Sequence, residues 1–321
     1  MNLFEALKDK YNLVTVLGPT ASGKTTLATR IASEFNTEII SADSRQVYRN
    51  MNIGTGKDIE EYTIDDRIIP YHLIDIAEAG EKYNVFQYQQ DFFSVFNDIL
   101  RKIKIPIMCG GTGLYIDAII NNYNLTKVPE NESQRKVLEQ KNMNELENIL
   151  ISLKKTHNVS DFDSKKRIIR AIEIEKYLKK HPEEKTDFPK IKSLNFGIKF
   201  DRQKQRERIT ERLKERLNNG MIDEVQHLLD VGVSPDTLIY YGLEYKFVTT
   251  YLLNEISYNQ MVEKLNIAIH QFSKRQMTWF RRMEKRNEKI WWINGDIAID
   301  KKIDRVKEVI FDYNIKKMSK E

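Results

Sequence analysis

Cysteine is almost missing from this chain, since Cys109 is the single one among 321 residues. A disulfide within the chain and a cysteine-based zinc site are therefore excluded. The five histidines show no metal-ligand spacing, so no histidine-based metal site is expected either. The first residues lack the apolar core of a signal peptide, and no apolar run approaches the length that spans a bilayer. These absences predict a cytoplasmic protein.

A strong net charge is also lacking, because 52 basic residues face 47 acidic ones and leave a balance of +5. This average hides two local excesses of basic residues. Ser164–Lys180 holds seven Lys or Arg against two Glu, and Lys274–Lys289 again holds seven against two. Each segment alone is more typical of a solvated helix face, but together they favour a polyanionic partner.

Glycine is scarce, with 13 residues, yet two of them shape the most informative segment of the chain. That segment fits the G-x-x-x-x-G-K-[ST] phosphate-binding pattern at every fixed position. An expected strand, Leu13–Leu17, precedes it, and an expected helix, Thr26–Ala32, follows it. Strand, loop and helix together predict a nest of backbone N–H groups that binds a di- or triphosphate. The residues assigned to this binding are Gly18, Pro19, Thr20, Ala21, Ser22, Gly23, Lys24 and Thr25.

Two side chains of the loop have expected roles of their own. Lys24 would neutralise phosphate charge, and the Thr25 hydroxyl would hold Mg²⁺, which makes Mg²⁺ the expected cofactor. Most such loops bind ATP or GTP, so the loop by itself does not identify its phosphate compound. The alternative is a chance glycine loop before a helix, which the agreement of pattern and context disfavours.

Strand and helix patterns alternate over the first 120 residues, as in a doubly wound α/β fold. Expected strands cover Leu13–Leu17, Glu38–Ser41 and Ile105–Cys109, and an expected helix covers Val85–Lys102. We therefore predict a P-loop NTPase-like α/β core with a mostly parallel sheet. Ligands of such folds bind beyond the carboxyl ends of the strands, so residues there are candidates for the site.

From about Asn121 the sequence becomes polar and helical in pattern, without glycine-bounded strands. This change predicts an inserted helical subdomain, followed by a return to the sheet through strands at Leu194–Phe200 and Lys289–Asn294. The expected divisions are 1–120 for the first part of the core, 121–160 for the insert, 161–230 for completion of the core with basic helices, and 231–321 for a helical C-terminal region packing on the core.

Asp43 follows the second expected strand and faces the same edge of the sheet as the phosphate loop. A carboxylate there can coordinate Mg²⁺ or act as a general base. Ser44 and Gln46 add hydrogen-bonding side chains close by. The alternative role for Asp43 is a helix N-cap, and the position beside a phosphate loop favours the functional role.

Glycines also end the third expected strand, in the cluster Gly110-Gly111-Thr112-Gly113. Nucleotide hydrolases and kinases commonly place an Asp at this strand end, and Ile105–Cys109 carries no acid. This absence argues against NTP hydrolysis and favours a site that leaves room for a large second substrate. Thr112 offers a hydroxyl there. The alternative is a tight turn without further role.

Two basic segments contain residues suited to phosphate or nucleic acid. Arg167 and Arg170 are three residues apart on one helix face and could close on a diphosphate or on nucleic-acid phosphates. Phe272–Arg282 mixes basic and aromatic residues, as surfaces do that stack unpaired bases. An exposed basic face is an equal alternative for the first segment, and an aromatic core face is the preferred alternative for the second.

Taken together, these motifs resemble those of the tRNA dimethylallyltransferase (tRNA isopentenyltransferase) family, over about Leu13 to Arg282. The order of the phosphate loop, Asp43-Ser44-x-Gln46 and the GGTG cluster carries the resemblance most specifically. Further matching segments are Ile53–Lys57, His72–Asp75, Arg167 with Arg170–Glu173, Arg212 with Gly220–Val225, and Lys274–Phe280.

The resemblance implies transfer of a dimethylallyl group from its diphosphate to N6 of the adenosine 3′ of the anticodon, in tRNAs that read codons beginning with U. The loop would hold the donor diphosphate, with Arg170 assisting, and Asp43 would be the general base. Catalytic roles fall to Asp43, Thr112 and Lys24, and Mg²⁺ to Thr25. The implied partners are tRNA and dimethylallyl diphosphate, without a membrane, for a protein expected to be monomeric and bacterial. The tRNA contacts would come from Asp43, Ser44, Arg45, Gln46, Thr112, Lys166, Arg167 and Arg170.

The chain departs from the family pattern in two places. The family usually has an Ile-Gly-Tyr-Lys/Arg segment, whereas this chain has Tyr241-Gly242-Leu243-Glu244-Tyr245-Lys246. It usually has Thr-Arg before the Lys-Arg-Gln run, whereas Ile269-His270 stand there. Both departures fall in segments expected to contact tRNA, so they concern the set of tRNAs and the affinity more than the reaction.

Three other functions remain open from the sequence. An adenylate isopentenyltransferase would act on free AMP or ATP, but it has no need of the basic helices. A P-loop kinase would use ATP, and the acid-free strand end counts against it. A non-catalytic, nucleotide-gated RNA-binding protein has no need of Asp43 beside the loop.

Overall fold

The computed structural model describes residues 3–153, 162, 164–181 and 188–318, and it divides into two compact units. The first unit comprises Met1–Asn122 and Lys190–Glu321, and the second comprises Tyr123–Pro189.

A six-stranded sheet forms the centre of the first unit, in the order β5-β2-β6-β1-β7-β8. Every pair of neighbours in it is parallel, so the predicted α/β class and parallel core are confirmed. The short β5 escaped prediction, as did the separate β3–β4 hairpin, Thr63–Ile64 with Arg67–Ile68. The strands of the sheet are β1 (Leu13–Leu17), β2 (Ile39–Ser41), β5 (Tyr71–His72), β6 (Ile107–Gly110), β7 (Ser193–Lys199) and β8 (Ile290–Asn294).

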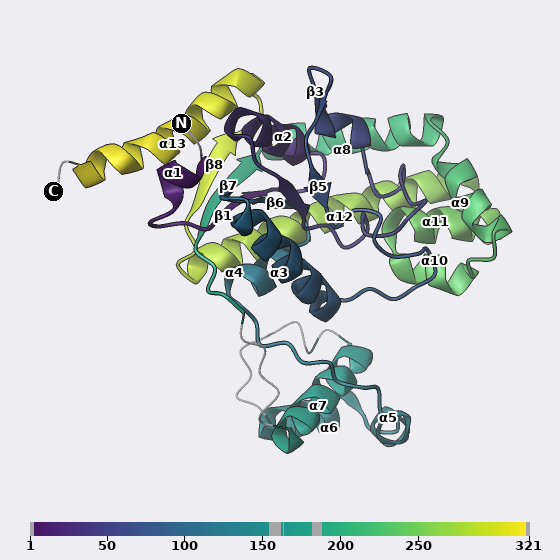
Figure 1. The fold of residues 1–321 in the computed structure, drawn as a ribbon. Coiled ribbons are helices and arrows are strands. Elements are labelled where there is room, and N and C mark those ends of the chain that lie inside the picture. The colour runs from purple at the N-terminus through teal and green to yellow at the C-terminus, as the bar shows by residue number, and fades with distance from the viewer. Residues whose placement is uncertain (1–2, 154–161, 163, 182–187, 319–321) are drawn as a thin grey trace. The chain divides into compact units, whose positions relative to one another are not determined.

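Helices cover both faces of this sheet (Figure 1). On one face α1 (Leu3–Leu7), α2 (Lys24–Phe35) and α13 (Ile299–Met318) share a hydrophobic core with the sheet. On the other lie α3 (Val85–Arg101) and α4 (Gly113–Ile120), and α4 also contacts α12 (Tyr258–Lys285). All five residues of β1 are buried, so both faces of the strand are covered, which explains why its sequence is apolar apart from Thr15.

A second hydrophobic core lies among the C-terminal helices of the same unit. It joins apolar side chains of the segment after β2, among them Tyr48 and Met51, to those of the helices. The chain beyond β2 is thereby packed between the sheet and the helices, so the strand-end residues are held on both sides. The helices that contribute, besides α12, are α8 (Arg202–Asn218), α9 (Met221–Asp230), α10 (Pro235–Tyr241) and α11 (Leu243–Leu252).

The second unit is helical, with α5 (Glu132–Glu139), α6 (Met143–Leu153) and α7 (Lys165–Lys180). Its extent corrects the expected insert, 121–160, because the unit continues to Pro189 and takes α7 from the segment assigned to the core. The physical reason is burial. Side chains of α7, including Ile168 and Ile172, pack against those of α6 and complete a small hydrophobic core. If α7 joined the sheet, the apolar side chains of α6 would be exposed.

One helix of this unit is fixed by a charged cluster. Glu173 of α7 is buried and accepts two hydrogen bonds from Arg135, both of 2.7 Å, and another from Arg170. Burial alone would raise the pKa of Glu173, but the hydrogen bonds from both arginines outweigh it and lower the pKa.

No helix within the described ranges is both long and apolar enough to cross a bilayer.

A buried carboxylate stabilises the start of β2. Glu38 is 3% exposed and accepts hydrogen bonds from His72 at 2.9 Å and from Lys102 at 3.0 Å, with Lys104 at 3.4 Å. Burial raises the pKa of Glu38, but these hydrogen bonds and the lysine charges outweigh it, so the folded-state pKa lies below the ordinary value of 4.5.

Acid should therefore destabilise the fold through Glu38. A carboxyl group with a depressed folded-state pKa contributes stability above its unfolded pKa and loses it as the pH falls through the folded value. Urea unfolding between pH 7 and pH 3 should show a steeper loss of unfolding free energy for the wild type than for Glu38→Gln. Glu60→Gln, at an exposed position, is the control; equal slopes for all three proteins would contradict this account.

Candidate active site

The phosphate loop runs between β1 and α2, and side chains of two later helices hold it. Gln276 of α12 is buried, and its Oε1 accepts from the Thr20 N–H at 2.8 Å. From α8, Gln205 donates to the Thr20 carbonyl at 2.7 Å and Arg208 donates to the Ala21 carbonyl at 3.0 Å. The first half of the loop is thus fixed by residues about 185 to 256 positions away in sequence.

The second half of the loop has the geometry of an anion nest. Ala21 and Gly23 both have a positive φ, of 59° and 75°, which turns successive N–H groups inward. In the part of the chain that the structure describes, the N–H groups of Ser22 and Gly23 donate to no acceptor. Helix α2 begins at Lys24, so its N-terminal N–H groups add to the same nest. These features fit a bound phosphate.

Lys24 lies enclosed at this helix start, and its Nζ donates to the Pro19 carbonyl at 3.4 Å. Burial lowers the pKa of Lys24, and the charge of Arg212 lowers it further, while Asp43 and Glu61 oppose the change. An amine in these surroundings gains its counter-charge when an anion binds.

Asp43 and Thr112 meet at the carboxyl ends of β2 and β6. Asp43 Oδ1 accepts from the Arg45 N–H at 2.9 Å and from the Gln46 N–H at 3.4 Å, so the carboxylate is held by its own turn. The Ser44 N–H donates to Thr112 Oγ1 at 3.0 Å. The structure therefore brings together the segments of two of the three predicted catalytic residues, Asp43 and Thr112, through a contact between residues 68 positions apart.

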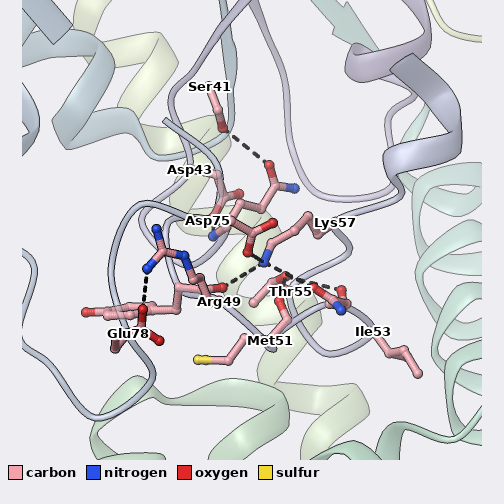
Figure 2. Close-up of polar contacts among 12 residues, drawn as sticks. Ser41, Asp43, Arg49, Met51, Ile53, Thr55, Lys57, Asp75 and Glu78 are labelled. Atoms are coloured by element: carbon pink, nitrogen blue, oxygen red, sulfur yellow. Dashed lines mark hydrogen bonds and ion pairs between the residues drawn. The ribbon is translucent and has the colours of Figure 1, made fainter. Parts of the chain in front are cut away.

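Gln46 is more constrained than the sequence indicated. Its Nε2 donates to the Gly56 carbonyl at 2.9 Å. Its Oε1 accepts from the Ser41 hydroxyl at 3.3 Å, the contact marked by the dashed line at Ser41 in Figure 2. Both ends of the amide are therefore engaged within the protein. Arg45, in contrast, places its guanidinium 5.6 Å from the Tyr241 ring centre, with the side chain half-buried.

Two charged side chains, buried Lys57 and half-buried Glu224, hold the segment that follows Asp43. Lys57 donates to Asp75 and to the Tyr48 carbonyl, and Figure 2 shows its amine facing Asp75. Glu224 of α9 accepts from the N–H groups of residues 52 and 53 at 2.7 Å and of residue 54 at 3.0 Å. Both residues, Lys57 and Glu224, lie in segments that match the family, but the sequence did not indicate what they do. In the structure both are positioning residues, because they hold the backbone after Asp43.

The glycine cluster after β6 leaves room for α12. A Cβ at Gly111 would collide with Gln276, and one at Gly113 would collide with Trp279. Gln276 Nε2 donates to the Gly111 carbonyl at 2.8 Å, so one amide joins the phosphate loop to the glycine cluster. Sequence reasoning missed this role, although Gln276 lies within a matching segment.

Replacing Gln276 by Ala should weaken binding of the donor. The change leaves the Thr20 N–H and the Gly111 carbonyl unpaired, which costs about 1–3 kcal/mol and is enough to raise the donor KM roughly tenfold. Gln271→Ala, at an exposed position on α12, is the matched control and should keep the wild-type KM. Equal donor KM values for both variants in steady-state assays would refute the bridging role.

Three predicted residues lie in the second unit. Lys166 and Arg167 are exposed on α7. Arg170 donates to Glu173 at 3.1 Å and to the Val128 carbonyl at 2.7 Å. These contacts are internal to the unit, and binding of tRNA or diphosphate by the three residues stays a prediction.

The described residues contain no group of three His, Cys, Asp or Glu side chains that could hold a metal ion. Mg²⁺ does not need one, because it is commonly bound by one or two protein oxygens plus substrate phosphates. The hydroxyl of Thr25, at the start of α2, is such a donor. It lies against the Cys109 thiol, whose pKa burial raises to about 12, so this thiol stays protonated at neutral pH.

Family comparison agrees with this arrangement. A family model described as IPP transferase matches residues 46–283, and one described as isopentenyl transferase matches residues 11–69. A protein named tRNA dimethylallyltransferase 2, from Bacteroides fragilis, is 53% identical over 94% of this chain and 99% of its own. The chain belongs to the tRNA dimethylallyltransferase family. A second relative, tRNA dimethylallyltransferase 1 from Parabacteroides distasonis, is 55% identical over 91% of this chain and 95% of its own.

Solved structures of the family share this fold. The tRNA isopentenylpyrophosphate transferase of Bacillus halodurans matches with a TM-score of 0.69 at 30% identity, over 96% of this chain and 99% of that one. A eukaryotic dimethylallyltransferase acting on tRNA matches with a TM-score of 0.74 at 23% identity, which concerns the fold alone. As a member of this family, the chain is an enzyme, a prenyltransferase.

Proposed function

We propose that this enzyme transfers a dimethylallyl group from dimethylallyl diphosphate to N6 of the adenosine 3′ of the anticodon, in tRNAs that read codons beginning with U. The observation that carries the proposal is the junction of a phosphate loop with Asp43 and Thr112 at an acid-free glycine turn, joined through Gln276. The absence of an acid at that turn counts against a kinase.

The donor is bound by its diphosphate. The N–H groups of the loop and the ammonium of Lys24 neutralise charge that grows on the leaving group. The Thr25 hydroxyl and the diphosphate oxygens would hold Mg²⁺, which supplies further positive charge when bound. Stabilising the departing diphosphate in this way weakens its bond to the first carbon of the dimethylallyl group.

Asp43 acts on the acceptor. The N6 lone pair of adenine is delocalised into the ring, so attack is helped by removal of a proton. The N6–carbon bond forms as the carbon–oxygen bond to diphosphate breaks, and the proton of N6 passes to the Asp43 carboxylate. The hydrogen bonds to Asp43 Oδ1 hold that carboxylate, and among the described residues Oδ2 has no hydrogen-bond partner. The Thr112 hydroxyl, next to Ser44, orients the acceptor.

The acceptor must be unstacked from its RNA strand to reach the donor carbon, as base-modifying enzymes require. Half-buried Asp43, Ser44 and Arg45 offer contacts to such a base, and the exposed basic residues of α12, Lys274, Arg275 and Arg281, suit the RNA backbone.

The direct test supplies dimethylallyl diphosphate, Mg²⁺ and unmodified tRNA, and follows prenylated adenosine by mass spectrometry. The expected product appears with tRNA and not with free AMP. Product from AMP at equal efficiency would instead indicate an adenylate isopentenyltransferase, and turnover of ATP would indicate a kinase. No product from a folded protein with a suitable tRNA would reject the proposal.

A further inference from the structure

Arg216 of α8 carries a buried donor atom without a partner. Its side chain is 13% exposed, and its Nη2 makes no hydrogen bond with any described residue. The carboxylates near it are too far for hydrogen bonding, with Asp58 Oδ2 at 3.9 Å from Nη2 and Glu244 Oε1 at 4.0 Å from Nη1. An unpaired buried donor is costly, so this position favours a ligand that completes it.

A second guanidinium converges on the same point. Gly56 has a φ of +65°, and a Cβ there would collide with Nη2 of both Arg216 and Arg212. Arg212 donates to Asp58 at 3.1 Å. Two like charges at one glycine repel each other, and the nearby carboxylates of Asp58 and Glu244 offset this only in part, because they lie 3.9 and 4.0 Å from the Arg216 guanidinium, beyond hydrogen-bond distance. An anion bound between them would remove the repulsion.

This arginine pair borders the reaction centre. The Gly56 carbonyl accepts from the side-chain amide of Gln46. The backbone N–H of the same Gln46 donates to Asp43. Besides burial, the positive charge of Arg212 lowers the pKa of Lys24. Besides burial, the negative charge of Asp43 raises the pKa of Glu244. The pair therefore lies within the electrostatic reach of both the donor loop and the proposed base.

We propose that Arg216 binds a phosphate oxygen of a substrate through its free Nη2, with Glu244 orienting the guanidinium. The planar, permanently charged fork of arginine suits phosphate oxygens, and a neutral ligand would leave the repulsion with Arg212 in place. The inference rests on the proposed function. The phosphate belongs either to the donor diphosphate or to the RNA backbone.

The pairing of Arg216 with Glu244 explains why this chain can depart from the family pattern at residue 244. The family segment Ile-Gly-Tyr-Lys/Arg has a cation two residues after its glycine, where this chain has Glu244 after Gly242. Arg216 faces that carboxylate from α8. In this chain Arg216 of α8 supplies the positive charge, and the Glu244 carboxylate on α11 orients its guanidinium.

The test compares Arg216→Met and Arg216→Lys with Arg206→Met, an exposed arginine on the same helix. Binding of inorganic diphosphate with Mg²⁺ is measured by calorimetry, and binding of a synthetic anticodon stem-loop RNA by fluorescence anisotropy at several salt concentrations. Arg216→Met should lower one of the two affinities about tenfold, with Arg206→Met unchanged in both. Arg216→Lys should recover only part, because it lacks the fork.

The two measurements separate the sources. Weaker diphosphate binding assigns Arg216 to the donor, whereas weaker RNA binding with a salt slope reduced by about one assigns it to an RNA phosphate. Both affinities equal to wild type in folded Arg216→Met would overturn the proposal. Because neither measurement needs turnover, an enzyme that makes no prenylated adenosine would reject the proposed function and leave this inference to be decided by binding.

A charge-swapped pair guards against misfolding. If Arg216→Met fails to fold because Glu244 is left unpaired, the double variant Arg216→Glu with Glu244→Arg restores opposite charges. It should regain most of the phosphate affinity, since the guanidinium then comes from α11. A folded double variant that binds diphosphate and RNA no better than Arg216→Glu alone contradicts the proposal.

Discussion

Asp43→Asn is expected to reduce turnover by about 10²- to 10⁴-fold, which is the usual contribution of a positioned general base. The amide keeps the oxygen that accepts from the Arg45 and Gln46 N–H groups, so the turn should survive. The loss then reports proton removal and not local unfolding. Single-turnover assays with saturating donor and tRNA measure the chemical step directly.

Binding distinguishes the base role from an RNA-contact role. We expect Asp43→Asn to bind the anticodon stem-loop as the wild type does, and Asp43→Ala to lose turnover to a similar extent. RNA affinity that falls by the same factor as turnover would refute the base role. Ser44→Ala is a useful comparison, because its hydroxyl lies beside Thr112 at 3.4 Å without a charge.

Lys24→Met should lower kcat/KM by about 10²- to 10³-fold, because it removes a positive charge from the developing diphosphate. The loop conformation should persist, since Gln276, Gln205 and Arg208 hold its backbone independently of Lys24. RNA binding is expected to stay within twofold of the wild type, a bound about equal to the experimental error of such free energies. A variant with full activity would show that the ammonium is not part of the site.

The lowered pKa of Lys24 also predicts a pH dependence of donor binding. Diphosphate binds the ammonium form, which is fully present at low pH and is lost as the pH rises through the depressed pKa. Affinity for inorganic diphosphate should thus decline at a pH below 10.5, the ordinary lysine value, and Lys24→Met should lack this decline. Calorimetry across pH 7 to 10 provides the measurement.

Sequence motifs and strand patterns predicted the parts of the site whose residues lie close together in the sequence. Gly18–Thr25 and Asp43 each follow a strand whose apolar run is visible in the sequence, and both are at the expected edge of the sheet. Thr112 follows the same logic. The parallel sheet then places these residues together, because strand ends of one direction share one edge.

Long-range partners were beyond such reasoning. Nothing in the neighbourhood of Gln276 indicates that its amide joins Thr20 to Gly111, because the contact depends on how α12 crosses the sheet. Arg216 is one of many charged residues in the sequence of a polar helix, and its burial comes from distant segments, at Gly56 and Glu244. The boundary at residue 160 was wrong for a similar reason, since the small core of the second unit takes its missing side chains from α7.

The amide of Gln276 has a consequence for the order in which the enzyme matures. A chain emerging from the ribosome makes its phosphate loop early, but one of the residues that hold this loop is made 256 positions later. Until α12 is synthesised and docked, the loop lacks its contact with Gln276 and the glycine turn lacks the same partner. Full affinity for the donor is therefore expected only after α12 has docked.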